Sequence, residues 1–303
     1  MMKLLLFFCL MAAAGGMGTE QLSVLQEGKA VIEVQKDEFS ANIPGLPLAD
    51  EDKFEAFQAK MNHLAYKEPQ DAKIGPGERI IPEKTGSKLN QDLFAARFYT
   101  YYYRPGSGRI DLPLLPVYPR VDSELLLSVK ARQIGQYVTY FNSHNKARTQ
   151  NIRLAAGSID SIVVFPGEVF SFNETVGKRT ASKGYLPAPV IVRGELSEGI
   201  GGGICQVSST LYNAVDNAGT SIIQRYSHSK RVPYVPSGRD ATVSWYGPDF
   251  TFKNTYNQPI LIRAQVYGGT LAIRVFSSDA IKYEPRNVPG AAKFSEEDEK
   301  AAD

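Results

Sequence analysis

The sequence contains few of the residues from which metal sites and disulfides are built, with two cysteines and three histidines among 303 residues. The histidines, His63, His144 and His228, are widely separated, and the His-Glu-x-x-His spacing is missing. A zinc site made of histidine and cysteine is therefore not expected. We predict no bound metal and no cofactor.

An excess of charge of one sign is also missing, since 34 Lys and Arg stand against 32 Asp and Glu, for a formal net charge of +2. There is no block rich in Lys and Arg. Attraction to nucleic acid is therefore weak, and we expect no nucleic-acid partner. The apolar run Leu4–Ala14 covers about half of the ~20 residues that a helix needs to cross a bilayer, so no permanent membrane span is expected.

The first residues do contain the pattern of a secretory signal peptide, which we place at 1–18. Lys3 supplies a positive start, an apolar run follows, and Ala12-Ala13-Ala14 gives the small residues of a cleavage site. We therefore expect an extracytoplasmic protein, secreted or associated with the cell envelope. Signal removal would also remove Cys9 and leave Cys205 as the only cysteine, which is unusual because exported chains generally pair their cysteines.

Composition divides the rest of the chain into three parts. Residues 19–120 are polar and interrupted by Pro and Gly, residues 121–281 hold short β-like runs between turn residues, and residues 282–303 are acidic and alanine-rich. We expect a smaller mixed N-terminal region, a β-rich C-terminal domain with one central helix, and a disordered acidic tail. The predicted fold class is therefore α+β.

Individual elements follow from apolar spacing. Residues 50–66 predict an amphipathic helix, with Phe54, Phe57, Met61 and Leu64 on one stripe. Residues 94–103 fit a helix or a strand, the prolines of 110–119 favour an edge strand or linker, and 122–135 look helical. Strands are predicted at Ser158–Val164, Val190–Val192, Thr220–Arg225, Ala241–Tyr246, Phe250–Lys253, Ile260–Val266 and Leu271–Phe276.

The central helix is predicted over 205–218, with Gly219 closing it, and it follows a glycine-rich run at 199–203. Glycines allow several backbone N–H groups to point into one concavity, and a helix N-terminus adds partial positive charge. Both favour the thiolate form of a cysteine placed there. Cys205 is therefore a candidate nucleophile. The alternative is a small buried side chain, which is common for cysteine.

Several segments occur in order between residues 151 and 273. They are Asn151-Ile-Arg-Leu-Ala-Ala, Phe165–Asn173, Val176–Thr180, Lys183-Gly-Tyr185, Gly201–Asn213, Arg225-Tyr-Ser-His228, Tyr234–Thr242 and Asp249–Asn254. Together they resemble the VanW domain, a family named for an accessory protein of vancomycin-resistance clusters. Upstream, residues 78–120 resemble the end of a peptidoglycan-binding domain. The resemblance implies a bacterial cell-envelope setting, with peptidoglycan or its peptide stem as partner, and no settled biochemical activity.

A base for the thiol is available downstream at His228, after a strand-like run. A helix packed on a sheet that returns a histidine toward the helix N-terminus is the layout of papain-like and transglutaminase-like folds, which is an argument from fold analogy. Asp240 is the candidate to orient the ring, with Asp249 second. In the structural alternatives, the serines beside His228 satisfy the imidazole, and Asp240 pairs with the arginine before it.

Substrate contacts are predicted for eight further residues: Gly201, Gly202, Gly203 and Gln206 at an oxyanion, Ser208 and Ser209 in a pocket, and Arg179 and Arg225 at a carboxylate. The structural alternatives are a small-residue packing face for the serines and ion pairs for the arginines. Asn173 is interpreted as a turn or cap residue.

Two functions remain open from the sequence. One is a cell-wall-directed thiol hydrolase or acyl-transferase that acts on peptide stems, supported by the lone cysteine, the glycines and the downstream His and Asp. The other is a non-catalytic module that binds peptidoglycan or a partner protein of the envelope, supported because no catalytic signature matches outright.

Overall fold

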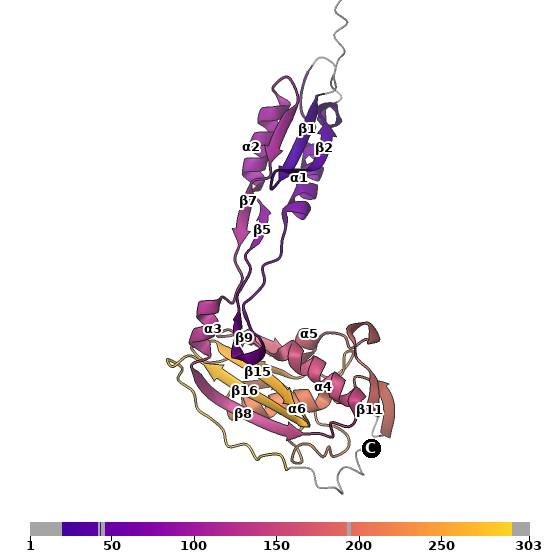
Figure 1. Ribbon diagram of the computed structural model, residues 1–303, viewed down its shortest axis with the longest axis vertical. Helices are drawn as coiled ribbons and strands as arrows, with labels where there is room; N and C mark the ends of the chain where they lie inside the picture. Colours follow the sequence, from indigo (N-terminus) through magenta and orange to yellow (C-terminus); the bar gives the residue numbers. More distant parts are fainter. Residues whose placement is uncertain (1–19, 42, 44–45, 193–194, 293–303) are drawn as a thin grey trace, which may run out of the picture. The chain divides into compact units, whose positions relative to one another are not determined.

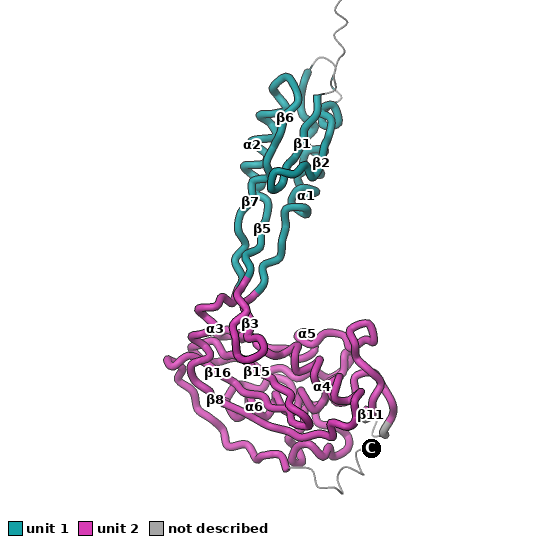
Figure 2. The backbone as a smooth tube through the Cα atoms, in the orientation of Figure 1, with its two compact units in different colours: residues 1–70, 84–119 teal, residues 71–83, 120–303 magenta. Residues whose placement is uncertain are grey.

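The computed structural model describes residues 20–41, 43, 46–192 and 195–292 (Figure 1). The predicted signal peptide lies outside these residues. The chain forms two compact units, residues 1–70 with 84–119 and residues 71–83 with 120–303 (Figure 2). The main chain therefore passes between the units after residues 70, 83 and 119. The sequence suggested one boundary, at 120, and did not indicate that 71–83 belongs with the second unit.

The first unit contains a small sheet with strand order β2-β1-β6, in which β1 pairs antiparallel with β2 and parallel with β6. Its elements are β1 (Gln21–Gln26), β2 (Lys29–Gln35), η1 (Lys36–Phe39), α1 (Glu51–Ala65), β5 (Gly86–Leu89), α2 (Gln91–Tyr102), β6 (Gly108–Asp111) and β7 (Leu114–Val117). Strands β5 and β7 form a separate antiparallel pair. Residues 94–103, whose aromatic residues fit neither period cleanly, are almost wholly helical, and residues 110–119 hold short strands.

Both helices of this unit begin at a polar cap and bury aromatic side chains. Asp50 accepts a hydrogen bond from the backbone N–H of Lys53, and Asn90 does the same for Leu93. The predicted stripe of α1 is buried except for Leu64, which is 42% exposed. The buried rings of both helices meet in one aromatic core formed by Phe39, Phe54, Phe57, Phe94 and Phe98.

The second unit is built on a sheet with strand order β8-β16-β15-β9, antiparallel throughout. Its strands are β8 (Arg132–Tyr140), β9 (Ile162–Val164), β15 (Ile260–Tyr267) and β16 (Thr270–Ser277). Side chains alternate between the two faces of the sheet. Ile260 and Ile262 join the main core, whereas Leu261 packs with Ile74 and Leu126 in a second cluster.

Two helices, α4 (Lys146–Ile159) and α6 (Ile204–Asn217), contact one face of this sheet and each other (Figure 1). The helix predicted at 205–218 is confirmed, and Gly219 follows it with φ +83°. Helix α4 was not predicted, and the strand expected from Ser158 begins only at Ile162. The helix expected at 122–135 is α3 (Ser123–Val129), after which the chain turns into β8.

The remaining elements lie around this core. They are β3 (Lys73–Ile74), η2 (Pro76–Glu78), β4 (Ile80–Ile81), β10 (Val169–Ser171), α5 (Phe172–Val176), η3 (Ala181–Lys183), β11 (Pro187–Val192), β12 (Glu195–Ile200), β13 (Ser221–Gln224) and β14 (Thr251–Lys253). Strands β10, β14 and β13 form a second sheet, and β11 pairs with β12 in a hairpin. The strand expected at 241–246 does not form, because this segment joins the site described below instead.

The disordered tail was predicted to begin too early. Residues 282–290 have no regular secondary structure but are bonded to the second unit. The backbone N–H of Arg286 donates to the Asn217 carbonyl at 3.0 Å, and the Tyr137 hydroxyl donates to the Pro289 carbonyl at 2.9 Å. Residues 293–303 lie outside the described residues.

Glu78 ties segment 71–83 to the main sheet of the second unit. Its carboxylate accepts hydrogen bonds from Arg263 at 2.8 Å and from Gln265, and forms an ion pair with Lys130 at 2.7 Å. Burial alone would raise the pKa of this carboxyl group, but the bonds from Lys130 and Arg263 outweigh burial and lower the pKa to about 2.

Glu78→Gln is expected to lower the melting temperature at pH 7 by about 2–4 °C, the usual effect of losing a partly exposed ion-pair network in a unit of this size. The carboxylate stabilises the fold fully above its ordinary pKa of 4.5, and this contribution disappears as the pH falls toward 2. Thermal melts of both chains from pH 7 to pH 2 should therefore converge at low pH. Glu284→Gln, at an exposed position of the same unit, is the control and should change nothing.

Candidate active site

Cys205 is the one residue on the first three turns of a buried helix that is not itself fully buried. From Ile204 to Val215, every side chain of α6 is buried except that of Cys205, which is half-buried. Gly203 occupies the N-cap position, and no side chain caps the helix. By contrast, Asp50, Asn90, Asp122, Asn145 and Ser171 cap the other described α-helices. The N–H groups of Ile204 and Gln206 donate to the carbonyls of Gly201 and Gly203, so among the described residues the Cys205 N–H is the first-turn donor left for another acceptor.

The glycines before Cys205 are required by close packing. Gly203 has φ +103°, a backbone conformation that residues with a side chain rarely adopt. A Cβ there would lie 3.0 Å from side-chain atoms of α4. A Cβ on Gly202 would lie 2.5 Å from the Pro189 carbonyl oxygen in β11. The Gly201 N–H donates to the Leu186 carbonyl, so the N–H groups of Gly202 and Gly203 are the candidates for an oxyanion.

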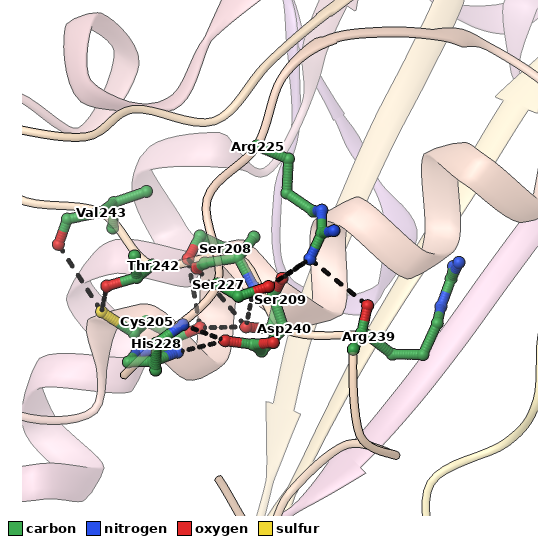
Figure 3. A network of polar contacts seen from close by, with 12 residues as sticks. Cys205, Ser208, Ser209, Arg225, Ser227, His228, Arg239, Asp240, Thr242 and Val243 are labelled. Carbon is green, nitrogen blue, oxygen red and sulfur yellow. Dashed lines mark hydrogen bonds and ion pairs between the residues drawn. The ribbon is translucent and has the colours of Figure 1, made fainter. Parts of the chain in front are cut away.

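His228 and Asp240 form a close pair on the irregular segment between β13 and β14 (Figure 3). The Nδ1 atom of His228 lies 2.6 Å from Oδ2 of Asp240, and the backbone N–H of His228 donates to the same oxygen at 2.6 Å. Both side chains are largely buried, with 5% and 9% of their surfaces exposed. The carboxylate therefore fixes the imidazole orientation, and the neighbouring serines do not.

The imidazole also interacts with the sulfur of Cys205. The two side chains lie side by side in Figure 3, and each shifts the pKa of the other. Because Nδ1 is held by Asp240, Nε2 is the ring nitrogen left for the sulfur. The structure thus brings together the thiol of Cys205, the imidazole of His228 and the carboxylate of Asp240 in that order.

This arrangement favours a thiolate–imidazolium pair. Burial alone would raise the pKa of the Cys205 thiol, but the hydrogen bond and charge of His228 outweigh burial and hold the pKa below its ordinary value of 9.0. Burial alone would lower the pKa of His228, but Cys205 and Asp240 raise it above 6.5. Hydrogen bonds from His228 likewise lower the pKa of Asp240 against the effect of burial.

Segment 241–244 forms the wall beside the sulfur. The sulfur lies 3.8 Å from the Thr242 hydroxyl and 3.6 Å from the Val243 carbonyl (Figure 3). Ser208 and Ser209 hold this segment in place: the Ser208 hydroxyl donates to the Ala241 carbonyl at 2.6 Å, and the Ala241 N–H donates to the Ser209 hydroxyl at 2.9 Å. Both serines are fully buried, so they position the wall of the site.

Gln206 and Arg225 have partners away from the sulfur. The buried Gln206 amide donates to the Thr139 hydroxyl and the Tyr140 carbonyl, and its oxygen accepts from Arg148 at 2.7 Å. The guanidinium of Arg225 donates to Ser227, to the Gly238 carbonyl and to the Asp240 carbonyl. Gln206 thus links α6 to β8 and α4, and Arg225 braces the segment that carries His228.

Arg239 and Asp249 do not make the contacts that the sequence suggested for them. Arg239 forms its ion pair with Asp216, at 2.7 Å, so Asp240 is free to hold His228. Asp249, the second candidate for orienting the ring, instead accepts from the Ser171 hydroxyl at 2.6 Å and from the Asn173 N–H at 2.9 Å.

Arg179 lies against the glycine loop. Its Cβ and Cγ are 3.6 and 3.7 Å from the position of a Cβ built on Gly201, and its Nη2 donates to Asn173 Oδ1 at 2.8 Å. Asn173 itself donates to the carbonyls of Ser244 and Pro248. Asn173 therefore connects Arg179 to the loop that follows the wall of the site, beyond its predicted turn or cap role.

Sequence reasoning missed two groups of site residues. Thr242 and Val243 contact the sulfur, and Asn151 holds the loop before it, accepting from the Leu186 N–H and donating to the carbonyls of Leu186 and Gly202. Asn151 stands in the segment Asn151-Ile-Arg-Leu-Ala-Ala, whose resemblance to the VanW family was the available signal.

Within the described ranges, no group of three or more His, Cys, Asp or Glu side chains is placed to hold a metal ion. In the same part of the chain, no helix combines the length and the apolar character that crossing a membrane requires.

Comparison with known proteins gives a consistent result. A family model described as VanW like protein matches residues 147–276. A Bacillus subtilis (strain 168) protein named "Uncharacterized protein YoaR" is 53% identical over 272 residues, covering 90% of this chain and 90% of the relative. The Enterococcus faecalis "Vancomycin B-type resistance protein VanW" is 33% identical over 109 residues, covering 34% of this chain and 40% of the relative. No solved structure gives a significant match. The family model does not reach residues 78–120, where the likeness to a peptidoglycan-binding domain stays a prediction.

Proposed function

We propose, from the premise that this chain belongs to the VanW family, that it is an extracytoplasmic thiol hydrolase or acyl-transferase that acts on peptide stems of peptidoglycan. The observation that carries the proposal is the contact of Cys205 with His228, which is itself held by Asp240 at 2.6 Å. The name of the Enterococcus relative connects that protein with vancomycin resistance, and the signal-like residues 1–18 agree with an envelope location.

The first half of the reaction forms a thioester. The Cys205 thiolate attacks the carbonyl carbon of the substrate amide, so that an Sγ–C bond forms and the carbonyl π electrons move to oxygen. The backbone N–H groups of Gly202, Gly203 and Cys205 stabilise the resulting oxyanion. When the C–N bond breaks, the proton on Nε2 of His228 passes to the leaving amine.

The second half releases the acyl group. A water molecule, or an amine in the case of transfer, loses a proton to Nε2 as it attacks the thioester carbon. The Sγ–C bond then breaks and the thiolate returns, paired with the imidazolium. Asp240 keeps the ring in position throughout, because it accepts from both the side chain and the backbone N–H of His228.

A non-catalytic binding role is the second candidate, and exposed aromatic residues near the site favour it. Trp245 is 40% and Tyr246 is 85% exposed, two and three residues after Val243, and Tyr226 is 48% exposed. Such side chains are typical of surfaces that bind a ligand or partner. The same surface can also hold a substrate for the enzyme, so detection of an acyl-enzyme decides between the two roles.

The test is to incubate the full chain with purified stem peptides, cross-linked and not cross-linked, and to analyse both protein and peptides by mass spectrometry. The proposal predicts a peptide adduct on Cys205 that hydroxylamine removes, together with a shortened or transferred peptide. Peptide binding with no adduct and no product, and a sulfur that reacts with alkylating reagents only after denaturation, would contradict the enzyme and leave the binding module.

A further inference from the structure

Arg179 is a sheltered cation beside the glycine loop that leads to Cys205. It lies between α5 and η3, with its aliphatic part against Gly201 and its guanidinium 5.7 Å from the centre of the Phe172 ring. One amino group, Nη2, is anchored on Asn173 at 2.8 Å. Packing and this bond together fix the plane of the guanidinium.

The other amino group, Nη1, has no partner. It is closed off from solvent and makes no hydrogen bond to any described residue. Burying a donor without an acceptor is costly, and burying a cation without a counter-ion costs more. Arg263, in the same unit, shows how a buried arginine is usually compensated. Its side chain is 5% exposed and forms ion pairs with both Asp160 and Glu78 at 2.8 Å.

The charged and polar groups that interact with Arg179 include the sulfur of Cys205. Burial lowers the pKa of the guanidinium, and interactions with Tyr185, Cys205 and Asp249 oppose that effect. Asp249 is already bonded to Ser171 and to the backbone of Asn173. Arg179 therefore interacts with the charge on the sulfur. Among the described residues, no carboxylate lies within ion-pair distance of its guanidinium.

We propose that Arg179 binds a carboxylate of the substrate through Nη1. This deepens the proposed function and rests on it, because the carboxylate is placed relative to the bond that Cys205 attacks. The substrate class is then a peptide that carries a free carboxylate close to the scissile amide, either at its C-terminus or on a neighbouring side chain. Arginine suits this role because its planar guanidinium matches a carboxylate and keeps its charge when sheltered.

The first test uses two alkylating reagents that differ in charge. The alkylation rates of Cys205 in the full chain are measured with iodoacetate and with iodoacetamide, and their ratio is divided by the same ratio for N-acetylcysteine. Arg179→Gln is expected to lower this normalised ratio by about 5- to 10-fold, the size of one charge-assisted contact. Lys178→Gln is the matched control. It removes the adjacent exposed cation, which is bonded to the Tyr246 hydroxyl, and should change the ratio by less than about twofold.

The second test needs no variant. Short acetylated peptides are compared for their ability to protect the wild-type Cys205 from iodoacetamide, each as a C-terminal acid and amide, and with Glu or Gln as the last side chain. Preference for the C-terminal acid, or for Glu, identifies which carboxylate Arg179 binds. Equal protection by acid and amide, and by Glu and Gln, overturns the inference.

The melting temperature separates binding from a structural role. Arg179→Gln should lower it by no more than about 2 °C, since the variant loses the bond to Asn173 but also removes a sheltered cation that has no counter-ion, whereas loss of a structural arginine would lower it further. An unchanged reagent ratio in Arg179→Gln, with iodoacetamide still reacting rapidly, overturns the inference and leaves the thiol nucleophile intact. A native chain that reacts with neither reagent overturns both proposals.

Discussion

Cys205→Ala is expected to abolish the thioester adduct and to lower turnover of stem peptides by about 10³-fold or more, because the variant has no nucleophile and leaves only binding and the oxyanion contacts. Cys205→Ser should lose nearly as much, since a hydroxyl group has a far higher pKa than a thiol and His228 is arranged to stabilise a thiolate. Turnover is measured by the release of peptide products, and the adduct by intact-protein mass.

The fold should survive both substitutions. The thiol lies 3.8 Å from Thr242 and 3.6 Å from Val243 and interacts with His228, which Asp240 still holds in both variants, and the neighbouring residues of α6 supply the packing. Melting temperatures within about 2 °C of wild type are therefore expected. Undiminished turnover by a folded Cys205→Ala chain would place the chemistry elsewhere and rule out the thiol mechanism.

His228→Ala is expected to slow alkylation of Cys205 near pH 7 by about tenfold or more. The imidazolium lowers the pKa of the thiol against the effect of burial, so its removal leaves burial to raise that pKa. Each unit of increase reduces the thiolate fraction at neutral pH about tenfold. The rate of reaction with iodoacetamide, measured from pH 5 to pH 10, should therefore shift toward higher pH as a whole.

Asp240→Asn provides an independent check on the same pair. The carboxylate raises the pKa of His228, so the amide should lower that pKa and narrow the pH range over which thiolate and imidazolium coexist. Ser229→Ala, at the exposed position beside His228, is the matched control and should leave the profile unchanged. A pH profile that is the same in wild type and His228→Ala would show that the two side chains do not interact in solution.

The sequence was informative where the signal was local. The apolar stripe of 205–218 predicted α6 and its end at Gly219, and the order of Cys205, His228 and Asp240 predicted three residues that the structure brings together. Each of these inferences needs only a short window or the chemistry of a residue type.

The rest depended on how an irregular segment folds. Residues 225–250 contain no helix or strand, and their path is fixed in part by side chains outside the segment, such as Ser208 and Ser209. Serine and arginine side chains are equally compatible with contacting a substrate and with holding a loop in place, so periodicity and composition could not assign the roles of Ser208, Ser209 and Arg225. Thr242 was missed for the same reason, because its position beside the sulfur follows from that path alone.

Segment 71–83 has a practical consequence for anyone who wishes to isolate the half of the protein that carries Cys205. A truncated chain that starts at 120 would strip Glu78 from Arg263 and uncover Leu261, so it should be unstable. The two ends to be joined are already neighbours, since Glu83 accepts from the Ser123 N–H at 2.9 Å and the Ala72 N–H donates to the Val121 carbonyl at 2.8 Å. A shortened protein in which residue 83 is spliced to residue 120 through a brief glycine-rich connection would keep both contacts and give a compact target for crystallisation and inhibitor screening.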